Sequence, residues 1–126
     1  MLKQTLSKNE MQIMNILWSM QRNACVNDVI EHFPEPRPAY TTVATFLKRL
    51  SLRGYVEYKK GEGKQYVYSP LISKATYRKK VMEEVKDICF DGSAKSLIDF
   101  FVQEEMLSDT EVSELLILIQ NTYGTE

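Results

Sequence analysis

The stretch from residue 39 to residue 68, AYTTVATFLKRLSLRGYVEYKKGEGKQYVY, decides the fold of this chain. Its first half has the apolar spacing of a helix that ends at Gly54, a residue suited to the left-handed position after a helix. Its second half has two runs of alternating residues with high strand propensity, on either side of a glycine-bearing loop. This pattern predicts a short β-hairpin, with strands at 55–58 and 65–68.

Two further helices are predicted upstream of this stretch. Ser7 and Glu10 have the spacing of a capping box and precede an apolar-faced helix that ends before the polar residues 21–23. A short second helix is expected over residues 25–33, after which the prolines of residues 34–38 prevent the helix from continuing. Three helices followed by a hairpin predict a winged helix-turn-helix domain over residues 1–70.

The downstream region, residues 71–126, is predicted to be helical, so the fold class is mainly α. Helices are expected over residues 73–91, 93–105 and 108–119, the last opened by a second capping box at Ser108 and Glu111. The net charge of −1 hides an asymmetry: residues 1–70 carry ten basic and six acidic residues, whereas residues 71–126 carry six and eleven. A basic half suggests contact with phosphate, and an acidic half suggests contact with protein.

The helix of residues 39–53 has an apolar face and a face of hydroxyls and cations. Val43, Phe46, Leu47 and Leu50 are expected in the core, with Leu52 as a further candidate. The opposite face contains no acidic residue, and three lysines follow in the hairpin loop. Such a helix suits the major groove of DNA, and such a loop suits the phosphate backbone. The expected DNA contacts are Tyr40, Thr41, Thr42, Thr45, Lys48, Arg49, Arg53, Lys59, Lys60 and Lys64.

Two other interpretations of this region remain open. The helix can be an ordinary surface helix with solvated charges, and the lysine-rich hairpin can be an edge that resists aggregation. The second interpretation is compatible with DNA binding. The alternative function is a winged-helix protein-interaction module that does not bind DNA.

The last predicted helix is apolar on nearly all sides between residues 115 and 119. A small domain cannot bury such a helix alone, so we expect a second copy of the chain to cover it. The expected dimer interface consists of Leu97, Phe101, Val112, Leu115, Leu116 and Ile119.

No enzyme or metal site is indicated by the sequence. His32 is the only histidine, the cysteines at 25 and 89 are far apart, and no phosphate-binding or nucleophile motif is present. We therefore expect no enzymatic activity, metal or cofactor. The polar N-terminus and the lack of a long apolar run predict a soluble, cytoplasmic protein that does not insert into a membrane.

Three segments together resemble the penicillinase-repressor family: LSKNEMQIMNILW, TTVATFLKRLSLRGYVEYKK and SLIDFFVQEEMLSDTEVSELLILI. The resemblance extends from about residue 6 to residue 119. It implies a homodimeric bacterial repressor that binds an inverted repeat in double-stranded operator DNA through its N-terminal domain. It also implies dimerisation through the C-terminal helices. Members of this family repress β-lactamase and methicillin-resistance genes.

The resemblance carries over to particular residues. The DNA-contacting positions of the family match Thr41, Thr42, Thr45, Lys48 and Arg49, and Ala44 stands where some relatives carry arginine. β-Lactam-responsive members are cleaved at an Asn-Phe bond after a membrane-bound metalloprotease sensor is triggered, which makes such a sensor a candidate partner. The matching pair here is Phe100-Phe101, a candidate cleavage position without the asparagine. The paired CxC motifs of copper-responsive relatives are absent.

Overall fold

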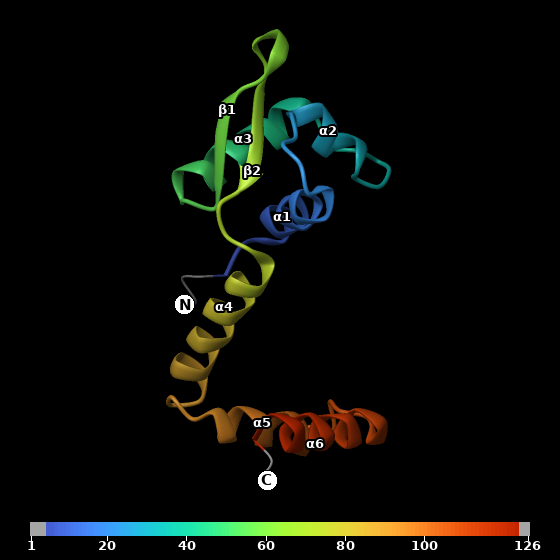
Figure 1. Ribbon diagram of the computed structural model, residues 1–126, viewed down its shortest axis with the longest axis vertical. Coiled ribbons are helices and arrows are strands. Elements are labelled where there is room, and N and C mark those ends of the chain that lie inside the picture. The colour runs from blue at the N-terminus through green and yellow to red at the C-terminus, as the bar shows by residue number, and fades with distance from the viewer. Residues whose placement is uncertain (1–4, 124–126) are drawn as a thin grey trace. The chain divides into compact units, whose positions relative to one another are not determined.

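The computed structural model describes residues 5–123 of the chain. This part is mainly helical and contains one two-stranded antiparallel sheet, as the sequence predicts (Figure 1). It falls into two compact units, with the boundary between Met82 and Glu83. The elements in chain order are α1 (Lys8–Met20), α2 (Val26–Glu31), α3 (Tyr40–Leu52), β1 (Val56–Lys60), the 3₁₀ turn η1 (Glu62–Lys64), β2 (Tyr66–Pro70), α4 (Lys74–Cys89), α5 (Ala94–Gln103) and α6 (Asp109–Tyr123).

The core of the first unit is built where α1, α2 and α3 meet. Each helix contributes fully buried aliphatic side chains at helical spacing, because a helix exposes the same face every three to four residues. Helix α1 buries Ile13, Met14 and Leu17. Helix α2 buries Val26 and Val29, and helix α3 buries Val43, Leu47 and Leu50. One expectation is wrong: Leu52 is 79% exposed, because it lies on the opposite face of α3 from this apolar stripe.

The hairpin is attached to the helical core at two places. Val56, at the start of β1, is buried in the core and pairs with Pro70 at the end of β2. Ala24, just before α2, exchanges both backbone hydrogen bonds with Tyr68 of β2, at N···O distances of 3.0 and 2.7 Å. Strand β1 extends to Lys60, further into the loop than the predicted end at residue 58, whereas β2 begins at Tyr66 and continues past the predicted end at residue 68 to Pro70. The turn is made around Gly63, whose φ is +70°. The winged helix-turn-helix fold is thereby confirmed.

The first unit extends past residue 70 into α4. The hydroxyl of Tyr77 accepts a hydrogen bond from the backbone N–H of Leu6 at 3.0 Å, and both residues are buried. The indole N–H of Trp18 donates to the carbonyl of Ile72 at 2.9 Å, and the Trp18 and Tyr77 rings lie 5.8 Å apart. The beginning of α4 is therefore part of the winged-helix core.

This boundary sharpens the charge asymmetry of the chain. Residues 1–82 hold fourteen lysines and arginines against six acidic residues, a net charge of +8, and residues 83–126 hold two against eleven, a net charge of −9. The difference from a division at residue 70 comes from four cations in the first turns of α4: Lys74, Arg78, Lys79 and Lys80.

The second unit lacks a buried core of its own. None of the described side chains from residue 83 to residue 122 is fully buried in the single chain. Its helices begin where the sequence predicts: the Ser93 hydroxyl accepts from the N–H of Ser96 at the start of α5, and Ser108 and Glu111 form the predicted capping box of α6.

Candidate nucleic-acid interface

One face of α3 is fully available to a ligand. The aliphatic stripe that anchors α3 in the core turns the other side of the helix outward. The predicted contact residues on that side are all exposed: Tyr40, Thr41, Thr42, Thr45, Lys48 and Arg49. The buried stripe thus orients a row of hydroxyls and cations toward solvent.

The cations of this face are not neutralised within the described chain. Lys48 and Arg49 make no ion pair there, and the Arg49 guanidinium lies over the Phe46 ring with its Cζ 5.6 Å from the ring centroid. Stacking on an aromatic ring limits the number of positions that a guanidinium occupies while leaving its N–H donors free. Arg49 is therefore a partly ordered donor with no acceptor among the described residues.

The threonine hydroxyls differ in how they are used. Thr45 donates its hydroxyl hydrogen to the carbonyl of Thr41, at an oxygen–oxygen distance of 2.8 Å, and so presents acceptor lone pairs and a methyl group. The hydroxyls of Thr41 and Thr42 make no hydrogen bond within residues 5–123. They can donate or accept, as contact with base edges requires.

The hairpin carries the remaining predicted cations. Lys59 and Lys60 are at the end of β1, and Lys64 ends the turn η1 with a φ of +68°. All three side chains are exposed and make no ion pair with any residue the structure describes. The hairpin tip is a cationic extension of the kind that tracks a phosphate backbone.

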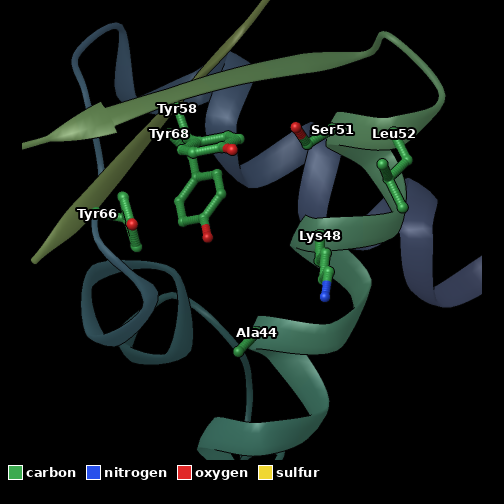
Figure 2. Close-up of a pocket in the computed structure, with 7 residues that line it drawn as sticks. All are labelled: Ala44, Lys48, Ser51, Leu52, Tyr58, Tyr66 and Tyr68. Atoms are coloured by element: carbon green, nitrogen blue, oxygen red, sulfur yellow. The ribbon is translucent and has the colours of Figure 1, made fainter.

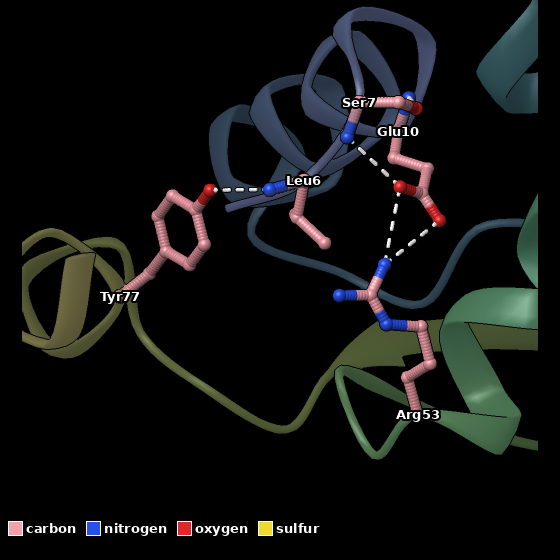
Figure 3. A network of polar contacts seen from close by, with 5 residues as sticks. All are labelled: Leu6, Ser7, Glu10, Arg53 and Tyr77. Carbon is pink, nitrogen blue, oxygen red and sulfur yellow. Dashed lines mark hydrogen bonds and ion pairs between the residues drawn. The ribbon is translucent and has the colours of Figure 1, made fainter. Parts of the chain in front are cut away.

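Arg53 differs from the other predicted contacts. Its Nη1 atom lies 3.2 Å from both carboxylate oxygens of Glu10 (Figure 3). Its guanidinium also stacks on the Tyr55 ring, with Cζ 5.2 Å from the ring centroid. Glu10 is 7% exposed and also accepts from the N–H of Ser7 at 2.9 Å. Arg53 thus joins the end of α3 to the start of α1, and its guanidinium is occupied by an internal partner.

This contact changes the titration of Glu10. Burial is the largest single influence and raises the pKa of the carboxyl, but hydrogen bonds from Ser7 and the charge of Arg53 together outweigh it. The pKa of Glu10 is therefore held below its ordinary value of 4.5.

Glu10→Gln is expected to reduce both stability and its pH dependence. A depressed folded-state pKa stabilises the protein above the unfolded-state pKa, and that stability is lost as the pH falls through the folded value. Loss of a charged hydrogen-bonded group should cost about 1.5–3 kcal/mol at pH 7. Urea unfolding should therefore give Glu10→Gln a lower free energy of unfolding than the wild type at pH 7. At about pH 3 the free energies of unfolding of the two proteins should be nearly equal.

The matched control for this experiment is Glu62→Gln, which removes an exposed carboxylate from the hairpin turn. It should leave the stability nearly unchanged at both pH values. A Glu10→Gln protein that loses stability in acid in parallel with the wild type would contradict the assigned role of Glu10.

The structure also reveals a cavity beside α3 that the sequence analysis did not predict. It lies between the later turns of α3 and the hairpin, with a volume of about 460 Å³ (Figure 2). Ala44 is half-buried in the cavity wall. Tyr58, Tyr66 and Tyr68 lie in the two predicted strands and line this cavity. The sequence does not show that they lie together, because that depends on the register in which the strands pair.

The apolar residues of the second unit fall into two groups. Of the predicted dimer contacts, Leu97, Phe101, Val112 and Leu115 are half-buried in the single chain, whereas Leu116 and Ile119 are exposed. Around them α6 also exposes Ile117 and Leu118, each by more than half of its surface. The Phe100-Phe101 pair lies inside α5, where the Phe100 ring packs edge-on against Phe90 at 5.5 Å.

Other site chemistries find no geometric basis in the described residues. Within residues 5–123 no three His, Cys, Asp or Glu side chains come together as a metal site, and no helix is long and apolar enough to cross a membrane. In the same range Cys25 and Cys89 are both free thiols.

Comparison with known proteins finds relatives along nearly the whole chain. The profile of the penicillinase repressor family matches residues 6–121. The methicillin resistance regulatory protein MecI of Mammaliicoccus sciuri is 31% identical over 111 residues, which cover 87% of this chain and 89% of that protein. The MecI protein of Staphylococcus aureus strain N315 is 30% identical over 111 residues, which cover 87% of this chain and 89% of that protein. The penicillinase repressor of Bacillus licheniformis is 25% identical over 116 residues, 91% of this chain and 89% of that repressor.

Proposed function

The chain belongs to the penicillinase repressor family of bacterial transcriptional regulators, and on that premise we propose that it represses transcription as a homodimer on an inverted repeat in operator DNA. The observation that carries the proposal is the exposed face of α3, which presents hydroxyls and unpaired cations and no acidic side chain. In the proposed complex this face enters the major groove, where threonines contact base edges. Lys48 and Arg49 then meet phosphates or a guanine.

The hairpin supplies affinity rather than sequence recognition. Lys59, Lys60 and Lys64 contact the phosphate backbone beside the groove that α3 enters. Arg53 is left out of the proposed contact set, because Glu10 already holds its guanidinium.

Dimerisation through the second unit is supported by its lack of a buried core. Apolar side chains on α5 and α6 that stay in water in one chain are covered when a second copy packs against them. The proposed interface contains Leu97, Phe101, Val112, Leu115, Leu116 and Ile119. Two linked winged-helix units can then read half-sites about one helical turn apart, roughly 34–36 Å centre to centre.

Loss of dimerisation is the proposed route of release from DNA. One winged-helix unit makes few phosphate contacts, and linkage to a second unit raises affinity through effective concentration. Cleavage at Phe100-Phe101, with a membrane sensor protease as the partner upstream, is one way to break the dimer. Both residues lie inside α5, so a protease gains access to this bond only when α5 unwinds locally.

The salt dependence of binding tests the electrostatic part of this function. A dimer that neutralises about eight phosphates should lose affinity with a slope of about −7 in a plot of log K against log salt concentration. The measurement is fluorescence anisotropy with a duplex taken from the DNA upstream of the gene, against a scrambled duplex of the same composition. A slope near zero would remove the phosphate contacts from the proposal.

Single lysine substitutions make this test specific. Because Lys60→Ala removes one cation from each subunit, it should reduce the steepness of the slope by up to about 2. Lys95→Ala removes the same charge from the acidic unit and should leave the slope unchanged.

A further inference from the structure

The cavity between α3 and the hairpin lies entirely within the first unit. Its walls come from two elements, with Ala44, Lys48, Ser51 and Leu52 on α3 and three tyrosines on the hairpin (Figure 2). A volume of about 460 Å³ is within the range of cavities that hold small organic ligands in proteins, roughly 300–1,000 Å³.

The hairpin wall is an aromatic surface. Tyr58 and Tyr68 face each other in the strand register, with ring centroids 6.0 Å apart, and Tyr66 packs edge-on against Tyr58 at 5.3 Å. Burial is the main cause that raises the pKa of Tyr68, so its hydroxyl stays protonated and available as a donor at neutral pH. The three rings thus form an organised aromatic wall with polar tips.

The α3 wall supplies space and one charge. Ala44 has no side chain beyond Cβ, which leaves room beneath it, and Ser51 offers a hydroxyl. Lys48 is the single charged residue that lines the cavity, and it makes no ion pair within the described chain. A planar ring would pack on the tyrosines, and an anionic group would neutralise Lys48.

We propose that this cavity binds a small aromatic acid, with the ring against Tyr58, Tyr66 and Tyr68 and the anionic group on Lys48. Lys48 also belongs to the proposed DNA-contacting face, so the acid and operator DNA compete for it. This competition rests on the proposed function. A ligand that binds only the DNA-free protein lowers the apparent DNA affinity in proportion to one plus the ratio of its concentration to its Kd.

The binding test uses the full chain without DNA and three probes: phenyl phosphate, phenol and inorganic phosphate. Calorimetry or chemical-shift titration should give phenyl phosphate an affinity about tenfold above that of phenol or of inorganic phosphate, which corresponds to about 1.4 kcal/mol each for the charge and for the ring. Equal binding of inorganic phosphate and phenyl phosphate would overturn the proposal, because the cavity would then recognise a phosphate group alone, as in a DNA backbone. Absence of binding by phenyl phosphate would overturn it as well.

Single substitutions test whether the tyrosines bind the ring of the ligand and whether Lys48 binds its anionic group. Tyr66→Leu removes an exposed ring and hydroxyl outside the proposed DNA contacts, and should weaken phenyl phosphate binding by about tenfold. Lys48→Ala should remove the preference for phenyl phosphate over phenol. Lys80→Ala, which deletes an equal charge from α4, should keep that preference. If Tyr66→Leu and Lys48→Ala bind phenyl phosphate like the wild type, the ligand lies elsewhere and the proposal fails.

The competition test separates this proposal from the repressor function. Phenyl phosphate should raise the protein concentration needed for half-saturation of the operator duplex for the wild type. For Tyr66→Leu, which still binds DNA, about tenfold more phenyl phosphate should be needed for the same rise. If neither the wild type nor any variant binds the operator duplex, the proposed repressor function is wrong. The ligand site is then tested by the titration without DNA alone.

Discussion

Leu116→Asp is expected to convert the protein from a dimer to a monomer and to weaken operator binding by about 10²- to 10⁴-fold, the usual gain from linking two binding modules. Leu116 is 56% exposed on α6, beside Ile117 at 57% and Leu118 at 60%. In the proposed dimer a second copy covers this surface. An aspartate there would be desolvated without a partner, which costs several kcal/mol.

The proposed DNA-contacting residues are not altered by this change, because Leu116 belongs to the second unit. Residues 83–122 bury no side chain fully in the single chain, so α6 contributes nothing to the core of the winged-helix unit. The monomer should therefore keep a folded N-terminal unit with weak binding to a single half-site. Sedimentation velocity would measure the mass, and anisotropy with full-site and half-site duplexes would measure the affinities.

Asn121→Asp is the matched control, because it adds the same charge to an exposed polar position on the opposite face of the same helix from Val112, Leu116 and Ile119. It should remain dimeric and bind the full site normally. A Leu116→Asp protein that sediments as a dimer and binds the full site like the wild type would contradict the proposed interface.

Arg49→Ala should weaken operator binding by roughly 5- to 150-fold for each half-site, corresponding to about 1–3 kcal/mol for each Arg49 contact. Arg49 is exposed on α3, free of ion pairs in the described chain, and held over the Phe46 ring. The variant should remain dimeric and as stable as an ordinary surface mutant, within about 0.5 kcal/mol. A protein-interaction module that does not bind DNA would instead be indifferent to this substitution.

Arg49→Lys distinguishes the two roles proposed for the side chain. Lysine keeps the charge and loses the two-pronged donor geometry, so it should preserve a phosphate contact and lose a paired contact with guanine. Lys95→Ala serves as the charge control in the acidic unit. Unchanged operator affinity in Arg49→Ala would exclude Arg49 from the interface.

The local signals in the sequence predicted the helix starts well. Both capping boxes, at Ser7 with Glu10 and at Ser108 with Glu111, form as their three-residue spacing predicts. A capping box depends only on residues within one helical turn, so no knowledge of the fold is needed to recognise it. The same holds for the aliphatic stripe of α3, whose period alone assigned Val43, Leu47 and Leu50 to the core.

Contacts between residues that are far apart in the chain could not be predicted from the sequence. Arg53 looked like one more cation of α3, but its partner Glu10 lies 43 residues away in the chain. The N-terminal unit was expected to end at residue 70, and Tyr77 extends it through a hydrogen bond to Leu6, 71 residues away. Neither contact has a periodicity that the sequence could display.

The sequence by itself determined the helices, the hairpin, the family and the cationic, hydroxyl-bearing face of α3, because these depend on short-range spacing and on residue type. Only the tertiary structure decided which cation Glu10 neutralises and how far the basic unit extends. It alone also placed three tyrosines opposite Lys48 around one cavity. The physical reason is that ion pairing, burial and cavity shape depend on distances between elements, and those distances exist only after the chain has folded.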